Sequence, residues 1–162
     1  MAINIDWHAT TKDGQNALIL VIKSTSREPE DIRIARSLVD HGVDVNAVDE
    51  DGQTALMHAC YKRKYRHISM LLDAGADPNL AQTASLMTPL HYACENGNDI
   101  TTKMLMCGGA DPNQVNSEGD TALLVAAGCG NVHCIEAMES GSRMCAKRAR
   151  EEPKVPIAAC YF

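Results

Sequence analysis

One stretch decides the architecture of this chain: TPLHYAC, at residues 88–94. Near-copies occur as TALMHAC at residues 54–60 and as TALLVAA at residues 121–127. A weaker copy, NALILVI, lies at residues 16–22. Self-similarity at a fixed period of roughly 20 to 50 residues indicates stacked repeats, so we expect a repeat architecture.

A second marker follows the first with the same period. GVDVN occupies residues 42–46, and GADPN occurs twice, at residues 75–79 and 109–113. The successive spacings are 33 and 34 residues. Because two independent markers keep the same period, chance similarity is a poor explanation.

Each copy carries local signals for the same succession of elements. A turn such as residues 51–52 (Asp-Gly) comes first, and then a threonine such as Thr88 can cap a short apolar helix. Pro89 fits the first helical position, where its missing N–H has no partner to lose. A second apolar helix ends at a glycine such as Gly75, and a polar stretch then projects as a hairpin-like finger.

This pattern resembles the ankyrin repeat. TPLHYA matches the Thr-Pro-Leu-His-x-Ala motif of that family in full, and the other copies match it in part. The resemblance covers about residues 5–141 and implies an all-α solenoid of about four stacked helix-turn-helix repeats with finger-like hairpin loops. The expected units are a partial finger at 1–15, repeats at about 16–49, 50–83, 84–116 and 117–141, and a C-terminal capping helix or tail at 142–162.

Three parts of the chain depart from the family pattern. The first repeat has five extra residues near 24–31, which form either a tolerated surface insertion or a contact for a specific partner. In the second repeat, Arg63 and Lys64 replace the usual Gly-His of the turn, and the basic cluster at residues 62–66 is either a solvated turn or an anion site. The fourth repeat loses its pattern after Ile135 and is one residue short at Gly141, where we expect it to end before a separate capping helix.

The N-terminal residues 5–8 align with residues 43–46, so the chain starts in the finger of a repeat whose helices are missing. Either the protein is longer than this chain, or Trp7 helps to cover the open end of the stack. We favour a fragment or a short isoform.

Charge and composition limit the functional classes. The net charge is -6, yet residues 141–162 hold five basic and two acidic side chains, so the body of the chain is acidic at about -9. An acidic body repels phosphates and argues against nucleic-acid binding, in spite of the basic residues 147–150. No apolar run approaches the roughly 20 residues that span a bilayer. Seven cysteines without a secretory signal indicate free thiols in a reducing compartment, so we expect the cytoplasm or the nucleus. We also expect a monomer.

Catalytic motifs are missing from the sequence. It has no glycine-rich phosphate loop, no Gly-x-Ser-x-Gly and no His-Glu-x-x-His, so we expect no enzyme, no cofactor and no metal site. Cys60 and Cys94 hold the same repeat position, which is typical of small core residues. The resemblance implies a structural role for His91, in which it hydrogen-bonds the backbone of a neighbouring finger.

Similarity to ankyrin domains implies that a partner binds the concave side, which fingers and inner helices form. The repeat register places fourteen residues there: Asp49, Glu50, Asp51, His58, Tyr61, Lys62, Gln82, Leu86, Tyr92, Glu95, Asn96, Ser117, Glu118 and Val125. Tyrosine is favoured at binding hot spots, and the finger at residues 49–51 is acidic. We therefore predict a protein partner that presents a peptide segment with an apolar or aromatic anchor and basic flanks. The alternative is that these acids simply belong to a solvent-exposed turn.

One modification and several functions stay open. Asn46, with Leu38 eight positions earlier and acidic and aliphatic residues just before it, fits the ankyrin pattern for asparagine hydroxylation. The leading function is a non-catalytic adaptor or scaffold module. Alternatives are a stand-alone inhibitor that masks a regulatory protein, the ankyrin part of a larger multidomain enzyme, and a binder of anionic nucleic acid or phospholipid.

Overall fold

The computed structural model describes residues 6–24 and 30–151, which form eight helices joined by turns and fingers. The helices are α1 (Ala17–Lys23), α2 (Glu30–Asp40), α3 (Ala55–Tyr61), α4 (Tyr65–Asp73), α5 (Pro89–Glu95), α6 (Asp99–Cys107), α7 (Ala122–Gly128) and α8 (Val132–Glu151).

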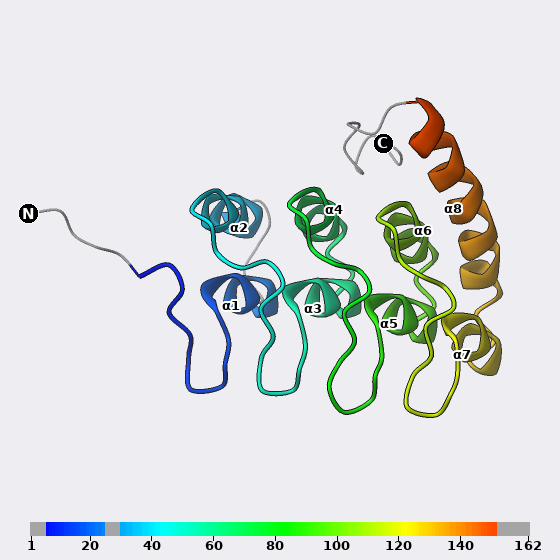
Figure 1. The fold of residues 1–162 in the computed structure, drawn as a ribbon, viewed down its shortest axis with the longest axis horizontal. Helices are drawn as coiled ribbons and strands as arrows, with labels where there is room; N and C mark the ends of the chain where they lie inside the picture. Colours follow the sequence, from blue (N-terminus) through cyan, green and yellow to red (C-terminus); the bar gives the residue numbers. More distant parts are fainter. Residues whose placement is uncertain (1–5, 25–29, 152–162) are drawn as a thin grey trace, which may run out of the picture.

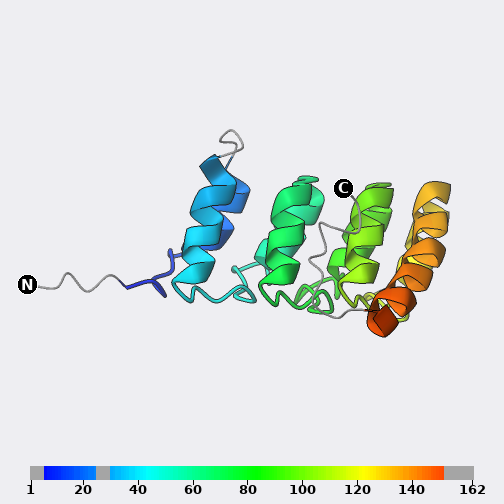
Figure 2. The same ribbon diagram turned by 90° about the horizontal axis from the view of Figure 1, so that it is seen from above.

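The helices lie in two rows. The odd-numbered helices form an inner row next to the fingers, and the even-numbered helices form an outer row behind them (Figure 1). Seen from above, the outer helices stand side by side along the stack (Figure 2). The two helices of each repeat pack against each other, and successive inner helices and successive outer helices also pack against each other. The prediction of an all-α solenoid is therefore confirmed.

Short side-chain caps start the inner helices. Thr54, Thr88 and Thr121 precede α3, α5 and α7, and each hydroxyl accepts the backbone N–H three residues later. Asn16 replaces threonine before α1 and accepts the N–H of Ile19 at 2.9 Å. These caps satisfy one of the backbone donors that every helix leaves unpaired at its N-terminus.

The fingers are narrow loops closed by isolated antiparallel bridges. Such bridges pair Thr10 with Asn16, Val48 with Thr54 and Val115 with Thr121, in three of the four fingers. The described residues include no extended β-sheet. The core between the repeats is built mainly from leucine, isoleucine, alanine, methionine and cysteine, as the low aromatic content of 4% requires.

The C-terminal helix differs from the expectation. We expected the fourth repeat to end at Gly141 and a separate capping helix to follow, but α8 runs without a break from Val132 to Glu151. Gly141 does not adopt the left-handed backbone of Gly75 and Gly109. A Cβ at Gly141 would lie 2.7 Å from the Cβ of Met106 in α6, so this glycine allows close packing of two helices.

Two further expectations concern the first repeat. Trp7 is half-buried, packs against the core and stacks on His41 with ring centroids 4.2 Å apart, so it does cover part of this end. Most of the extra loop, residues 25–29, lies outside the described residues, and α2 begins directly after it at Glu30.

Candidate partner-binding surface

The fourteen residues predicted for the concave side differ in their exposure. Eight of them are exposed: Glu50, Asp51, Tyr61, Lys62, Leu86, Glu95, Ser117 and Glu118. Five are half-buried: His58, Gln82, Tyr92, Asn96 and Val125. The remaining residue, Asp49, is only 6% exposed.

The structure corrects the role expected of Asp49. We placed it with Glu50 and Asp51 among the acids at a finger tip, but its carboxylate points inward. One carboxylate oxygen lies 2.9 Å from Nε2 of His58 and 3.4 Å from Nζ of Lys23, and the other accepts the N–H of Gln53 at 2.9 Å. The side chain therefore joins the finger to α1 and α3 and offers little to a partner.

Electrostatics at Asp49 and His58 follow from this arrangement. Burial by itself would raise the pKa of Asp49, but hydrogen bonds from His58 and the Gln53 backbone bring the pKa below its ordinary value. Burial lowers the pKa of His58, and the nearby cations of Lys23 and Lys62 lower it further against the opposing effect of Asp49. We therefore expect His58 to be neutral at pH 7, with Asp49 as the charged member of the pair.

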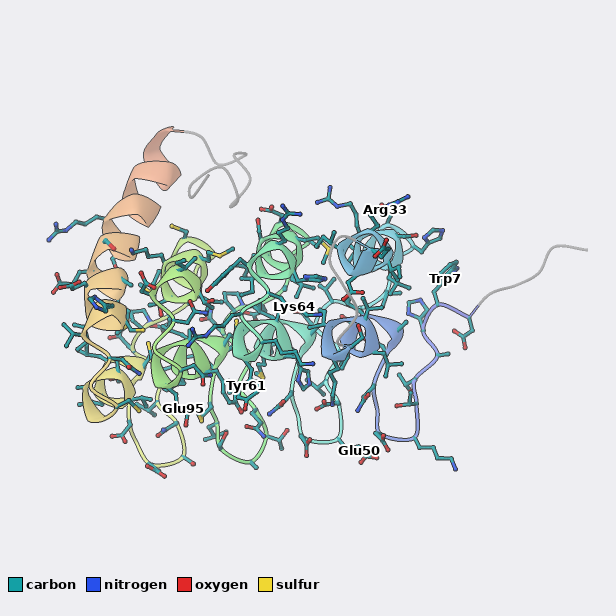
Figure 3. The ribbon with its side chains drawn as sticks, turned by 180° about the vertical axis from the view of Figure 1, so that it is seen from behind. Trp7, Arg33, Glu50, Tyr61, Lys64 and Glu95 are labelled. Atoms are coloured by element: carbon teal, nitrogen blue, oxygen red, sulfur yellow. The ribbon has the colours of Figure 1, made fainter. Side chains whose placement is uncertain are left out.

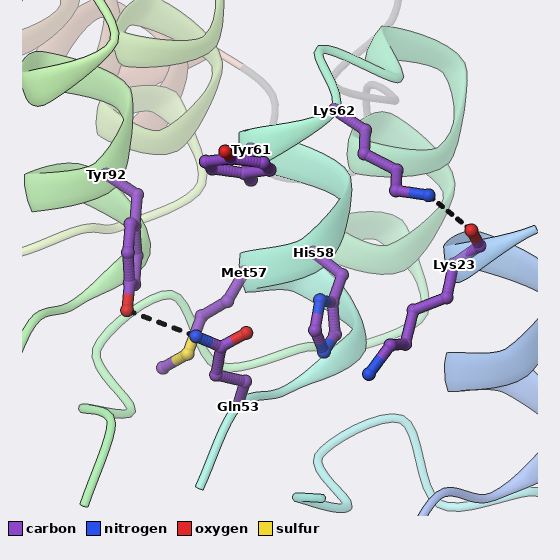
Figure 4. A pocket seen from close by; sticks show the side chains of 7 residues that line it. All are labelled: Lys23, Gln53, Met57, His58, Tyr61, Lys62 and Tyr92. Atoms are coloured by element: carbon purple, nitrogen blue, oxygen red, sulfur yellow. Dashed lines mark hydrogen bonds between the residues drawn. The ribbon is translucent and has the colours of Figure 1, made fainter. Parts of the chain in front are cut away.

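A hollow of about 300 Å³ opens on the inner helices next to this cluster (Figure 4). Three successive repeats contribute its lining residues: Lys23, Gln53, Met57, His58, Tyr61, Lys62 and Tyr92. Four of these were predicted from the repeat register. The volume is at the lower end of the roughly 300–1,000 Å³ range of ligand sites, which suits a single bulky side chain.

Of the two tyrosines that line the hollow, Tyr92 is held by hydrogen bonds and Tyr61 is exposed. The hydroxyl of Tyr92 accepts a hydrogen bond from Nε2 of Gln53 at 3.3 Å and donates one to Oε1 of Gln82, so its ring is held in place. Tyr61 is 65% exposed at the end of α3. An exposed aromatic ring beside a fixed one is a favourable arrangement for an apolar contact.

Acidic side chains surround the hollow at a distance. Glu50 lies at the tip of the second finger, whereas Glu95 lies at the end of α5 (Figure 3). Glu118 and Ser117 belong to the last finger and Val125 to α7, so the hollow does not include these predicted residues. The structure thus concentrates the candidate surface on the first three repeats.

Sequence reasoning missed three lining residues. Lys23 holds the same place in α1 as Tyr61 in α3, so the repeat register could have identified it. Met57 stands at the position of the motif histidine. Because that position is usually structural, the sequence did not indicate that Met57 lines a binding surface. Gln53 reaches Tyr92 from 39 residues away, and this contact depends on how two repeats stack.

The basic cluster at residues 62–66 connects neighbouring repeats. Nζ of Lys62 donates to the backbone oxygen of Lys23, and Nη2 of Arg63 donates to that of Asn96 at 2.7 Å. Nζ of Lys64 lies 3.3 Å from a carboxylate oxygen of Asp31. Three of its cations thus have partners within the chain, so these contacts link neighbouring repeats, and the cluster as a whole does not form one anion site.

The expected structural role of His91 is confirmed. Its Nδ1 accepts the N–H of Thr88 at 3.2 Å, and its Nε2 donates to the backbone oxygen of Asp120 in the next finger at 3.0 Å. Burial lowers the pKa of His91, which keeps the ring neutral for these two roles. Cys60 and Cys94 are both fully buried in the core, as their shared repeat position predicts.

Asn46 takes part in a ladder of amide contacts between repeats. Its Oδ1 accepts the N–H of Asp77 at 2.8 Å, and its Nδ2 donates to the oxygen of Gly75 at 3.4 Å. Asn79 makes the equivalent contacts with Asp111 and Gly109 one repeat later. Hydroxylation of Asn46 stays a prediction.

No group of three His, Cys, Asp or Glu side chains in the described part of the chain is arranged to hold a metal ion. None of the helices described is long and apolar enough to cross a membrane.

Comparison with known proteins agrees with the fold. A family profile described as ankyrin repeats (3 copies) matches residues 1–82 and 81–148, and the chain belongs to the ankyrin-repeat family. It is 31% identical over 110 residues to ankyrin repeat domain-containing protein 63 of Homo sapiens and 30% identical to that of Mus musculus, each over 65% of this chain. It is 37% identical over 75 residues, 45% of this chain, to protein lin-12 of Caenorhabditis elegans. The matches span 29%, 28% and 5% of these three relatives.

Proposed function

We propose that this chain is a non-catalytic adaptor or scaffold module that binds another protein through its concave side. Ankyrin repeats are generally protein-interaction modules, and members of the family are typically non-catalytic. The observation that supports the concave side is the hollow between three repeats, where Tyr61 is 65% exposed beside a fixed Tyr92.

The partner we propose is a peptide segment with an apolar or aromatic anchor and basic flanks. The anchor fits Tyr61 and Tyr92, since aromatic rings supply apolar contact, and the buried Met57 lies behind them. The exposed acids Glu50 and Glu95 lie outside the hollow and favour basic residues further along the segment. Asp49 is no longer part of this acidic set because it is buried.

The test compares which proteins are captured by the wild type and by two variants. Tyr61→Ala with Tyr92→Ala removes the aromatic contacts of the hollow, whereas Arg33→Ala changes an exposed residue of the outer helix α2. We expect the double variant to lose the partners that the wild type and Arg33→Ala both retain, with a loss of affinity of about tenfold or more, the range of hot-spot residues.

The folding of the double variant must be checked separately, because Tyr92 hydrogen-bonds Gln53 and Gln82. Far-UV circular dichroism and a urea titration provide that control. A folded double variant that binds the same partners with unchanged affinity would remove the concave side as the binding surface.

A further inference from the structure

Basic and acidic side chains lie on opposite sides of the hollow, and this asymmetry indicates which charges a partner carries on each side. Figure 4 shows Tyr92 on one side of the hollow and Lys23 and Lys62 on the other, with Met57 and His58 between them. Glu95 follows Tyr92 at the end of the same helix, α5, so the anionic side chain lies on the Tyr92 side. The hollow therefore has a basic wall, formed by Lys23 and Lys62, on one side, and Glu95 lies beyond Tyr92 on the other.

Only Lys23 of the basic wall has an acidic partner within the described part of the chain, and that partner lies beneath the surface. Asp49 is the acid that contacts Lys23, at 3.4 Å, and its side chain is only 2% exposed. The same carboxylate oxygen also lies 2.9 Å from His58. A molecule that enters the hollow thus meets two ammonium groups, while the carboxylate that balances one of them lies beneath the surface.

Lys62 and Lys23 are also held together by a direct contact. Nζ of Lys62 donates to the backbone oxygen of Lys23, which places the exposed ammonium of Lys62 at the wall formed by α1 and α3. A lysine ammonium has three N–H donors, so Lys62 keeps donors for a ligand after this contact is made. A carboxylate is the natural acceptor for them in a protein partner.

From this geometry we infer that the hollow takes a bulky apolar side chain of a partner segment whose adjacent residue is acidic, with that carboxylate against Lys62 and Lys23. This inference rests on the proposed function and adds that the partner residue next to the apolar anchor is negatively charged. Basic residues of the segment then lie on the other side, toward Glu95. The segment consequently has one orientation across the repeats.

The test is a selection of random twelve-residue peptides displayed on phage against the immobilised chain, followed by affinity measurements on the enriched peptides. We expect an aromatic or large aliphatic residue next to Asp or Glu. Replacing that acid with its amide is expected to weaken binding by about two- to fivefold, the effect of one exposed ion pair. Lys62→Gln is expected to cause the same loss and to remove the preference for the acid.

Lys12→Gln is the matched control, because Lys12 is another exposed lysine and lies in the first finger, away from the hollow. This variant has the same change in net charge, and its preference for the acidic neighbour is expected to equal that of the wild type. If the Lys12 and Lys62 variants lose the same affinity for peptides with the acidic neighbour, the effect comes from net charge alone and the inference is overturned.

The remaining outcomes separate the inference from the proposed function. Peptides that depend on Tyr61 but carry a neutral or basic residue beside the anchor would overturn the inference and leave the concave side as the docking surface. If no peptide is enriched, or if the enriched peptides bind a folded Tyr61→Ala variant equally well, both the inference and the proposed surface are wrong.

Discussion

Asp49 and Asp51 are two residues apart in one finger and have different environments. Asp51 is exposed, whereas the carboxylate of Asp49 is buried against His58 and Lys23. A buried carboxylate of this kind stabilises the fold only while its hydrogen-bond partners are present, since removing either side leaves polar groups unpaired. The two residues are therefore a natural pair for comparison.

Asp49→Ala is expected to lower the free energy of unfolding by about 2 to 3 kcal/mol, because His58, Lys23 and the Gln53 backbone lose a shared acceptor. Asp51→Ala is expected to change it by less than about 0.5 kcal/mol, as at most exposed positions. Urea unfolding of both variants measures the difference. Equal costs would show that the inward carboxylate does not connect the finger to the helices.

The same carboxylate predicts a pH dependence. The pKa of Asp49 is lowered in the folded state, so its contribution is complete above the unfolded-state value of about 3.9 and is lost as the pH falls through the folded value. His58 acts in the same direction, because its lowered pKa favours the neutral ring and acid therefore destabilises the fold. We expect the difference in stability between the wild type and Asp49→Ala to shrink below about pH 4 in urea titrations. A difference that is constant down to pH 2 would contradict this assignment.

At the scale of the element, the fingers share a sequence pattern but not the same surroundings. Gly52 and Gly119 both follow an acidic residue at the turn of a finger and both have positive φ, at 71° and 85°. A Cβ on Gly52 would lie 2.7 Å from the backbone nitrogen of Thr83, whereas a Cβ on Gly119 would meet nothing within 4 Å. Fingers two and three are thus in close contact at Gly52, whereas the fourth finger is open at Gly119.

Gly119→Ala is expected to cost about 1 kcal/mol, the penalty of a left-handed backbone for a residue with a Cβ. Gly52→Ala is expected to cost clearly more, about 2 to 4 kcal/mol, because Thr83 must also move. Thermal or urea unfolding gives both values. Similar losses of unfolding free energy for the two substitutions would mean that Gly52 of the second finger does not pack closely against Thr83 of the third.

At the scale of the whole molecule, the position of a repeat in the stack decides what its residues do. Leu56 and Leu123 hold the same motif position, yet Leu56 is 1% exposed and Leu123 is 47% exposed. The next repeat covers Leu56, while α7 is the last inner helix of the described stack. Each repeat contacts only its neighbours, so burial depends on the repeat that follows.

Leu56→Ala is therefore expected to cost about 2 to 5 kcal/mol, since it creates a cavity between repeats. Leu123→Ala is expected to cost less than about 1 kcal/mol in the same chain, because water already reaches the side chain. Equilibrium urea unfolding of the two variants tests this. A large cost at Leu123 would indicate that another part of the protein covers this end.

Much of this structure could be predicted from local patterns. The period of 33 and 34 residues, the caps at Thr54 and Thr88 and the glycine at Gly75 predict helices, turns and fingers, because each signal acts within a few residues. The same register identified Tyr61 and Tyr92 as part of the candidate surface. The continuation of α8 through Gly141 was missed, since a helical glycine and a terminating glycine look alike in sequence.

Local patterns in the sequence thus predict the repeat and its elements, and the repeat register indicates the candidate side for binding. Only the tertiary structure decided that Asp49 turns inward, that Lys23 and Met57 complete a hollow, and that Gln53 reaches Tyr92 from 39 residues away. The reason is physical: caps and turns depend on near neighbours in the chain. The hollow depends on contacts between successive repeats, which exist only once the repeats have stacked.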